Sequence, residues 1–373
     1  MADTVEVSII VPALNEAENI PLLVPRVHQA MGTRSYELII VDDASRDNTK
    51  AVCADLATKY PLKLIVREKP TAGLSGAVLH GMKEARGGYL VVMDADLQHP
   101  PEKLPELLRP LDRDEADFVL GSRNVPGGET DEKWGVARKI NSFVATALAR
   151  PFAGKIRDPM SGFFALRRVS YEGATRLTPL GYKIALELMC KARVQHVKEI
   201  PIRFGLREHG QSKLSIKQQF RYLEHLSRLY DFKYPRLSPV TKFLIVLGLG
   251  WCIGAAIFYT LIHAHLGIAR ACMAAYLANL ATTAVFHIRY IRTQREFIIR
   301  PQPWLDFLLI AIMELIACAG SALWVARRVT HPNPWETFVI AFGCATLVRY
   351  ILRKELLLDI RGLRKEFRKE ELS

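Results

Sequence analysis

Two aspartates that follow an apolar run have the clearest chemistry in this sequence. The run YLVVM begins at Tyr89, and Asp94 and Asp96 follow it with only Ala95 between them. Two carboxylates so close together repel each other unless a positive charge lies between them. Gln98 adds another oxygen ligand, and hard oxygen ligands suit Mg²⁺ or Mn²⁺, which keep coordination positions open for substrate phosphates. We therefore expect these residues to bind a divalent cation and, through it, a diphosphate.

The segments around this pair predict an α/β domain. Short β-branched runs begin at Val5, Tyr36, Leu62, Tyr89 and Ala116, and helical patterns separate them. Repeated strand, helix and strand units predict a mostly parallel, doubly wound sheet with helices on both faces. Ligands of such sheets lie beyond the carboxyl ends of the strands.

Polar residues follow three of the predicted strands. They are Pro12, Asn15 and Glu16 after the first strand, Asp42 and Asp43 after the second, and Asp94, Asp96 and Gln98 after the fourth. One such group would be ordinary turn chemistry, because Pro, Asn and Asp are common turn residues. Three acidic groups at one edge of a sheet favour a binding site.

The second part of the chain has the composition of a membrane domain. Charged residues make up 24% of the sequence, yet hydrophobic residues reach 50%, because long uncharged stretches follow residue 243. We expect the α/β domain over residues 1–210 and an amphipathic interfacial helix and linker over 211–240. An all-α membrane domain over 241–353 and a basic cytosolic tail over 354–373 would follow.

Four transmembrane helices are expected in that domain, near residues 243–262, 268–287, 305–326 and 335–352. Arginines gather between the second and third spans and after the fourth, where Arg349 is the first of them. The positive-inside rule then places the α/β domain and the C-terminus in the cytosol. Six scattered cysteines and an N-terminus without a secretion signal agree with a reducing compartment.

Two polar residues fall inside the expected spans, Asn279 in the second and Glu314 in the third. A carboxylate that faces lipid is costly, so Glu314 is expected either to be buried or to be functional. A buried Glu314 would pair with Asn279 or remain protonated.

Two amphipathic stretches, residues 135–154 and 215–232, allow two interpretations. Their apolar sides could lie in the lipid surface with the basic residues at the head groups. They could also pack against the sheet, and the sequence leaves both possibilities open.

Five motifs occur in an order that resembles the family 2 glycosyltransferases. They are PALNE from Pro12, VDDASRDNT from Val41, MDADLQHPP from Met93, GSR from Gly121 and DPMSGFFALRR from Asp158. Within that family the chain resembles the dolichyl-phosphate mannose synthases, through GLSGAVLHGMKEARG from Gly73 and REHGQSKLSI from Arg207. The resemblance covers essentially the whole α/β domain and implies a GT-A fold, and the membrane half is similar to the four-helix extension of some members.

The resemblance also implies roles for particular residues. The set that would hold the nucleoside is Pro12, Leu14, Glu16, Val41 and Asp43, with Leu14 where the family often has Tyr. The set that would hold the metal and the diphosphate is Asp94, Ala95, Asp96 and Gln98. Lys183 would contact the donor, and Arg207 and Lys213 would lie on a loop that closes over it.

The acceptor is inferred from whether the reaction needs a general base. A sugar hydroxyl requires a general base, whereas a phosphate monoester, with a second pKa of about 6, is mostly ionised at neutral pH. Arg123, Arg138 and Ser142 suit the binding of such a phosphate. Asp158 is a candidate for a base or for a turn or helix cap, and this choice stays open.

The expected activity is therefore a direct, inverting displacement, with Asp96 and Arg123 as the catalytic residues. The resemblance implies GDP-mannose as donor, dolichyl phosphate in a lipid bilayer as acceptor, and no nucleic-acid partner. The host membrane would be the endoplasmic reticulum in a eukaryote or the plasma membrane in a prokaryote.

Three other interpretations remain. One is a polyprenyl-phosphate glucosyltransferase that uses UDP-glucose, since a carboxylate and backbone groups can bind either base. Another is a processive polysaccharide synthase, whose QxxRW motif is approached by Gln218, Arg221 and Tyr222. In the third, the membrane half translocates lipid or binds a partner, as Glu314 and Asn279 would suggest.

Overall fold

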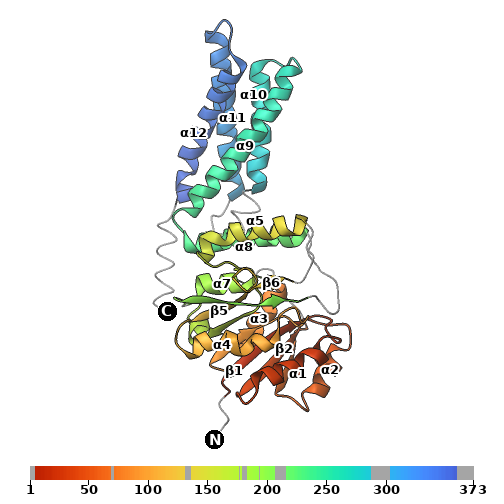
Figure 1. Ribbon diagram of the computed structural model, residues 1–373. Helices are drawn as coiled ribbons and strands as arrows, with labels where there is room; N and C mark the ends of the chain where they lie inside the picture. The colour runs from red at the N-terminus through yellow and green to blue at the C-terminus, as the bar shows by residue number, and fades with distance from the viewer. Residues whose placement is uncertain are drawn as a thin grey trace. The chain divides into compact units, whose positions relative to one another are not determined.

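The computed structural model describes residues 5–68, 71–130, 136–175, 177–178, 183–192, 194–205, 216–286 and 303–358 (Figure 1). Two of the predicted donor-binding residues, Arg207 and Lys213, lie outside these residues. The chain divides into two compact units, Met1–Leu229 and Tyr230–Ser373, and each is described by itself.

The first unit is built on a seven-stranded sheet. Its strands are β1 (Val7–Ala13), β2 (Tyr36–Asp42), β3 (Leu62–Val66), β4 (Tyr89–Val92), β5 (Phe118–Ser122), β7 (Phe164–Arg167) and β8 (Val197–Pro201). They lie in the order β3-β2-β1-β4-β7-β5-β8, and β7 alone among these described strands runs antiparallel to its neighbours. The mostly parallel sheet and its first five strands are confirmed, whereas β7 and β8 were not predicted.

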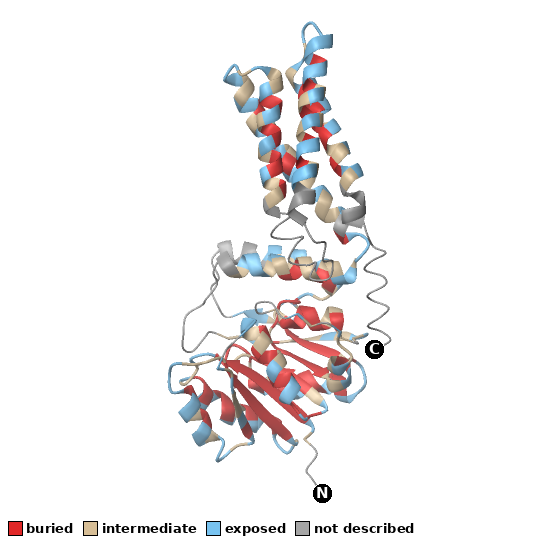
Figure 2. Ribbon diagram, turned by 180° about the vertical axis from the view of Figure 1, so that it is seen from behind, coloured by how far each residue is buried: buried red, intermediate tan, exposed pale blue. Residues whose placement is uncertain are grey.

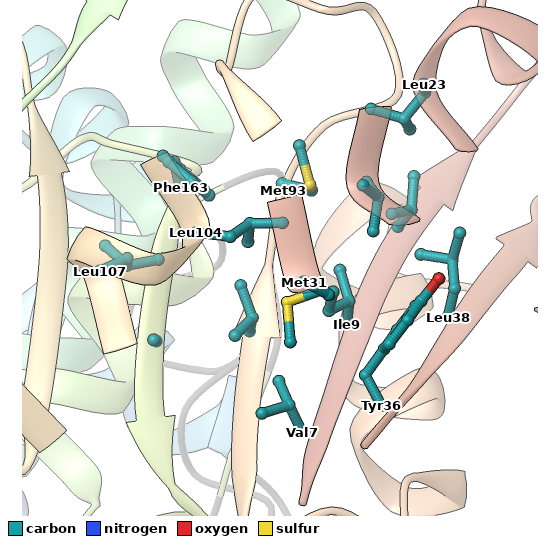
Figure 3. Close-up of a cluster of buried hydrophobic side chains, with 14 of the residues drawn as sticks. Val7, Ile9, Leu23, Met31, Tyr36, Leu38, Met93, Leu104, Leu107 and Phe163 are labelled. Atoms are coloured by element: carbon teal, nitrogen blue, oxygen red, sulfur yellow. The ribbon is translucent and has the colours of Figure 1, made fainter. Parts of the chain in front are cut away.

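Helices cover both faces of this sheet. They are α1 (Ile20–Met31), α2 (Thr49–Leu56), α3 (Gly73–Glu84), the short η1 (Pro101–Lys103), α4 (Leu104–Asp112), α6 (Arg168–Glu172) and α7 (Ile184–Lys191). Successive residues of a strand point to opposite faces, so Ile9 packs with α1 and α4 while Ile10 packs with α3 and α7. Figure 2 shows the strands as the most buried elements, and Figure 3 shows Ile9, Leu23 and Leu107 in the cluster of the first face.

Two longer helices lie side by side on this unit, α5 (Val136–Ala153) and α8 (Ile216–Lys233) (Figure 1). The Tyr222 hydroxyl of α8 donates a hydrogen bond to the carbonyl oxygen of Ala145 in α5, at 2.7 Å. Phe143 is 72% exposed and Phe220 is 60% exposed, yet both helices also bury residues such as Phe152. Each helix therefore has one side packed on the protein and another side that presents apolar residues.

A two-stranded sheet completes the unit. It pairs β6 (Glu129–Thr130) with β9 (Arg203–Phe204) in parallel. Through Gly205, the residue after β9, this small sheet reaches the loop that follows β4.

In the described residues beyond α8, the second unit has four helices, α9 (Ser238–His263), α10 (Ile268–Phe286), α11 (Pro303–Arg328) and α12 (Pro334–Leu358). Among the described residues, three stretches are long and apolar enough to cross a membrane: Val240–His263, Leu308–Arg328 and Pro334–Leu352. The expected second span is a helix, α10, but it is not one of these three. The number of four crossings stays a prediction.

A buried ion pair holds three of these helices together. Arg349 of α12 donates from Nε and Nη2 to Oε2 of Glu314 in α11, at 2.9 and 2.8 Å. Tyr276 of α10 donates to the same oxygen at 3.1 Å, and Arg349 Nη1 donates to the Thr283 hydroxyl at 3.1 Å. The structure thus differs from the sequence-based expectation, because α12 continues to Leu358 and Arg349 lies inside the unit rather than beyond the span.

Removing Arg349 alone should destabilise the second unit, because it leaves the Glu314 carboxylate buried without this partner. Loss of one member of a buried ion pair costs about 3 kcal/mol, whereas replacing both members is far less harmful. We expect Arg349→Met to lower the free energy of unfolding in detergent, and the pair Arg349→Met with Glu314→Gln to restore most of the loss. The exposed Arg328→Met is the control, and an equal loss in the single and paired variants would contradict this account.

Candidate active site

Three strand-end loops meet at one edge of the sheet because β1 lies between β2 and β4. Each of these loops contains one non-glycine residue whose backbone has the left-handed conformation, with a positive φ. They are Asn15 after β1, Ala44 after β2 and Leu97 after β4, with φ of 59°, 62° and 63°. This conformation costs residues that carry a Cβ roughly 1 kcal/mol or more, and such strain gathers at functional sites.

The loops after β1 and β2 contain the predicted nucleoside-binding residues. The Glu16 carboxylate accepts a hydrogen bond from Asn19 Nδ2 at 2.6 Å, and Asp43 forms an ion pair with Arg67 at 2.7 Å. Burial raises the pKa of Asp43, and the nearby Arg67 opposes that rise. Leu14 is 40% exposed at the edge.

Two other members of that set, Pro12 and Val41, lie within the strands β1 and β2 and are buried. The side chain of Val41 packs in the core against α3, where Gly81 comes close to it. Only the backbone of Val41 is therefore placed to contact a ligand at the edge.

The predicted metal ligands form a tight turn after β4. The backbone N–H of Gln98 donates to Asp96 Oδ1 at 3.2 Å, which folds the turn back on its own carboxylate. The Gln98 side-chain amide donates to the carbonyl oxygen of Gly205 at 3.1 Å, and the Gly205 N–H donates to the Gln98 carbonyl oxygen at 3.0 Å. Ala95 is buried in the core, and the Asp94 side chain keeps 33% of its surface exposed.

The donor set of this turn fits a divalent cation shared with a substrate. Among the described residues, no three His, Cys, Asp or Glu side chains converge as metal ligands. The turn offers two carboxylates and one amide, which is the partial set that Mg²⁺ accepts when substrate phosphates complete its coordination. Gly162 packs close to this turn. A Cβ at that position would lie only 3.2 Å from Asp94 Oδ2, so a larger residue would crowd the carboxylate.

His99 supports this turn, although the sequence analysis did not select it. Its Nδ1 accepts the backbone N–H of Asp94 at 3.0 Å. The ring stacks on Phe163, with centroids 5.4 Å apart, and meets the edge of Phe204 at 5.5 Å. Burial lowers the pKa of His99 to about 4, so the imidazole stays neutral and keeps its acceptor nitrogen.

Arg123, which follows β5, forms a two-pronged ion pair with Asp158. Its Nε lies 2.7 Å from Oδ2 and its Nη2 lies 2.8 Å from Oδ1. Asp158 also accepts the Arg123 backbone N–H at 3.1 Å, and the guanidinium lies 5.0 Å from the Phe204 ring centre. Burial favours the protonated form of Asp158, but the hydrogen bonds and charge of Arg123 hold the pKa of this carboxyl below its usual value. A carboxylate with a lowered pKa is a poor general base.

Lys183, immediately before α7, reaches the same place. Its Nζ donates to the Met160 carbonyl oxygen at 3.0 Å. Burial and the neighbouring Arg123 lower the pKa of Lys183 to about 8, against the opposing effect of Asp158 and Asp94. The structure therefore brings Lys183 close to both the predicted metal ligands and the Arg123 pair.

The remaining predicted acceptor residues, Arg138 and Ser142, belong to helix α5. Their side chains lie outside the described residues, as do Arg207 and Lys213. The described part of the site thus has carboxylates on the turn after β4 and cations on the segments that carry Arg123 and Lys183. Such a site suits a ligand with phosphate groups that bridges a metal and fixed positive charges.

Comparison with known proteins shows the family of the chain. Residues 8–173 match the family described as Glycosyl transferase family 2. The chain is 44% identical over 244 residues to the dolichol-phosphate mannosyltransferase of Pyrococcus furiosus, over 65% of this chain and 68% of that protein. It is 43% identical over 242 residues to the enzyme of that name from Saccharomyces cerevisiae, over 62% of this chain and 89% of the other. It is 39% identical over 216 residues to the polyprenol monophosphomannose synthase of Mycolicibacterium smegmatis, over 56% of this chain and 80% of the other.

The Arg123–Asp158 pair predicts a pH dependence of stability. The folded pKa of Asp158 is depressed below the unfolded value of about 3.9, so its stabilising effect is present above pH ~4 and is lost as the pH falls through the folded pKa. We expect Asp158→Asn to lower the unfolding temperature of the full chain at pH 7. The difference from the wild type should shrink below pH ~4. The exposed Asp55→Asn is the control, and a difference that stays constant with pH would refute the ion-pair explanation.

Proposed function

Because the chain belongs to the family 2 glycosyltransferases, we propose that it transfers mannose from GDP-mannose to a polyprenyl phosphate such as dolichyl phosphate. The observation that carries this proposal is that the site contains both carboxylates and fixed cations. The turn with Asp94 and Asp96 supplies carboxylates, and Arg123 and Lys183 supply cations beside it. The names of the similar enzymes support the choice of donor sugar and lipid acceptor.

The donor would lie across the ends of β1, β2 and β4. The nucleoside would lie by the loops that hold Glu16 and Asp43, and its diphosphate by the turn after β4. Asp94, Asp96 and Gln98 would hold Mg²⁺ or Mn²⁺, which when bound neutralises the charge that develops on the departing diphosphate. Lys183, held by the Met160 carbonyl, would add a positive charge on the donor side.

The acceptor would need orientation rather than deprotonation. A phosphate oxygen of the lipid forms a bond to the anomeric carbon of mannose while the bond from that carbon to the diphosphate oxygen breaks. The anomeric configuration inverts, and GDP leaves with the electron pair. Arg123 would orient the lipid phosphate, and its ion pair with Asp158 fixes the direction of the guanidinium.

The apolar surfaces of the protein support an acceptor held in a bilayer. Three stretches of the described second unit are long and apolar enough to cross a membrane. In the first unit, Phe143 of α5 and Phe220 of α8 expose their rings, which suits helices at a lipid surface. A cytosolic position of the catalytic unit is part of this proposal, and the arginine distribution supports it.

The direct test is an assay of the full-length protein with labelled nucleotide sugars and a prenyl phosphate. Mannosyl transfer from GDP-mannose should exceed glucosyl transfer from UDP-glucose, and one glycolipid rather than a sugar polymer should form. Asp96→Asn should abolish the transfer without lowering the unfolding temperature, because a neutral amide holds a divalent cation poorly. Asp55→Asn should retain activity. Full turnover by Asp96→Asn, or in excess chelator, would remove the metal assignment.

Substitution of Arg123 tests the division of the site. Arg123→Met alone would leave the buried Asp158 carboxylate without its partner, so it is combined with Asp158→Asn. We expect this paired variant to raise the KM for the prenyl phosphate by about tenfold or more while GDP affinity by calorimetry changes little. Asp158→Asn alone is the matched control. Weaker GDP binding with an unchanged acceptor KM would assign Arg123 to the donor instead.

A further inference from the structure

A buried cluster of ionisable side chains lies between α7 and α8 and has no part in the reaction described above. It consists of Glu187 and Lys191 of α7 and His225 of α8, whose side chains are 1%, 4% and 2% exposed. Burial of several ionisable groups stabilises a fold no better than apolar packing, and in some proteins it serves to fix one arrangement of the chain. The contacts of these residues show which arrangement is fixed here.

Glu187 connects three segments of the first unit. Its Oε1 accepts the Thr178 backbone N–H at 2.7 Å and the Lys191 ammonium at 2.7 Å. Its Oε2 lies 3.4 Å from Nε2 of His225. Burial alone would raise the pKa of Glu187, but His225 and Lys191 hold it at about 2, so the carboxylate is charged at neutral pH.

The position of Lys183 depends on these contacts. Lys183 lies between Thr178 and Glu187 in the chain, and α7 begins at the next residue. One carboxylate therefore anchors the chain on both sides of Lys183. Lys191 reinforces the same anchor, because its Nζ also donates to the Thr178 hydroxyl at 3.0 Å.

Helix α8 enters this arrangement through two neighbouring turns. His225 faces Glu187 of α7, and Tyr222, one turn earlier, bonds to the Ala145 carbonyl of α5. Leu226 and Leu229 of α8 are buried like His225, whereas Phe220 and Leu223 are exposed. The helix with the exposed apolar side is thus in contact with α7, the helix that begins immediately after Lys183.

We propose that His225 and Glu187 are positioning residues that couple the seating of α8 to the position of the Lys183 ammonium. A shift of α8 moves His225, and through Glu187 it moves the segment that places Lys183 beside Asp94 and Arg123. This inference rests on the proposed function in one respect, namely that Lys183 contacts the donor. It adds that helix α8, which exposes Phe220 and Leu223 on its other side, determines how well the donor is held.

A double-mutant cycle on the full-length protein tests this coupling. The variants are His225→Leu, Lys183→Met and the two combined, and the readouts are the donor KM, kcat and GDP affinity by calorimetry. We expect His225→Leu to raise the donor KM about tenfold in the wild-type background and to have almost no effect when Lys183 is already replaced. A structural role alone would give the same loss in both backgrounds, and that result would overturn the proposal.

Conservative variants extend the test to the case in which His225→Leu does not fold. His225→Gln keeps an N–H donor for Glu187 and should restore most of the donor affinity, whereas Glu187→Gln removes the charge and should weaken it. His196→Leu, at a histidine whose side chain is 73% exposed, is the matched control and should behave as the wild type. Unchanged donor KM and GDP affinity in both His225→Gln and Glu187→Gln, with the fold retained, would also overturn the proposal.

Failure of the proposed function would look different. If the wild type transfers no mannose but binds a nucleoside diphosphate, the same cycle is measured on that affinity alone. Non-additivity there would support the coupling while the proposed reaction is rejected. Additive effects in an active mannosyltransferase would reject the coupling and leave the reaction in place.

Discussion

The repulsion between the carboxylates of Asp94 and Asp96 is the constraint on which the site depends. Two acids so close together in the chain stay in position only if the backbone that carries them is held firmly. Strand β4 lies between β1 and β7, and its last three residues are buried. The turn beyond it is fixed by the hydrogen bond from Asp94 to His99 and by the two bonds that join Gln98 to Gly205. The left-handed conformation of Leu97 is maintained by the same contacts.

This rigidity gives the site its electrostatic character. Arg123 and Lys183 add cations to the site, and each of them is itself fixed, one by Asp158 and the other by the Met160 carbonyl. Charges that are already oriented need little rearrangement when a substrate arrives, which is the main source of electrostatic stabilisation in enzymes. The aromatic rings of Phe163 and Phe204 pack against His99, whose side chain is only 3% exposed.

Much of the fold could be predicted from the sequence, for identifiable reasons. The five predicted strands are mostly apolar runs that contain β-branched residues, and they alternate with helical patterns. The strand β7 was not predicted because its sequence, FALR, contains no β-branched residue, and because no periodicity shows that it inserts antiparallel between β4 and β5. The edge strand β8 contains Lys198 and Glu199 and has no buried residue, so it lacks an apolar signal.

In the site too, residues with a local sequence signal could be predicted, whereas contacts between residues far apart in the chain could not. Acidic strand ends are local signals, and Asp94 and Asp96 were found from them. The partner of Arg123 is 35 residues away and the partner of Glu314 is also 35 residues away, so spacing alone could not pair them. His99 was overlooked for a related reason, since the role of its ring depends on Phe163, just before β7, and on Phe204 of β9.

The state of Asp158 links this geometry to the choice of acceptor. A general base works best with a pKa near the working pH, whereas Arg123 lowers the pKa of Asp158 and occupies both of its oxygens. Under the proposed function this is no defect, because a lipid phosphate arrives already ionised. A neutral hydroxyl would need the proton acceptor that Asp158 cannot readily be. The ion pair therefore favours anionic acceptors, and it does so through the same guanidinium that would orient them.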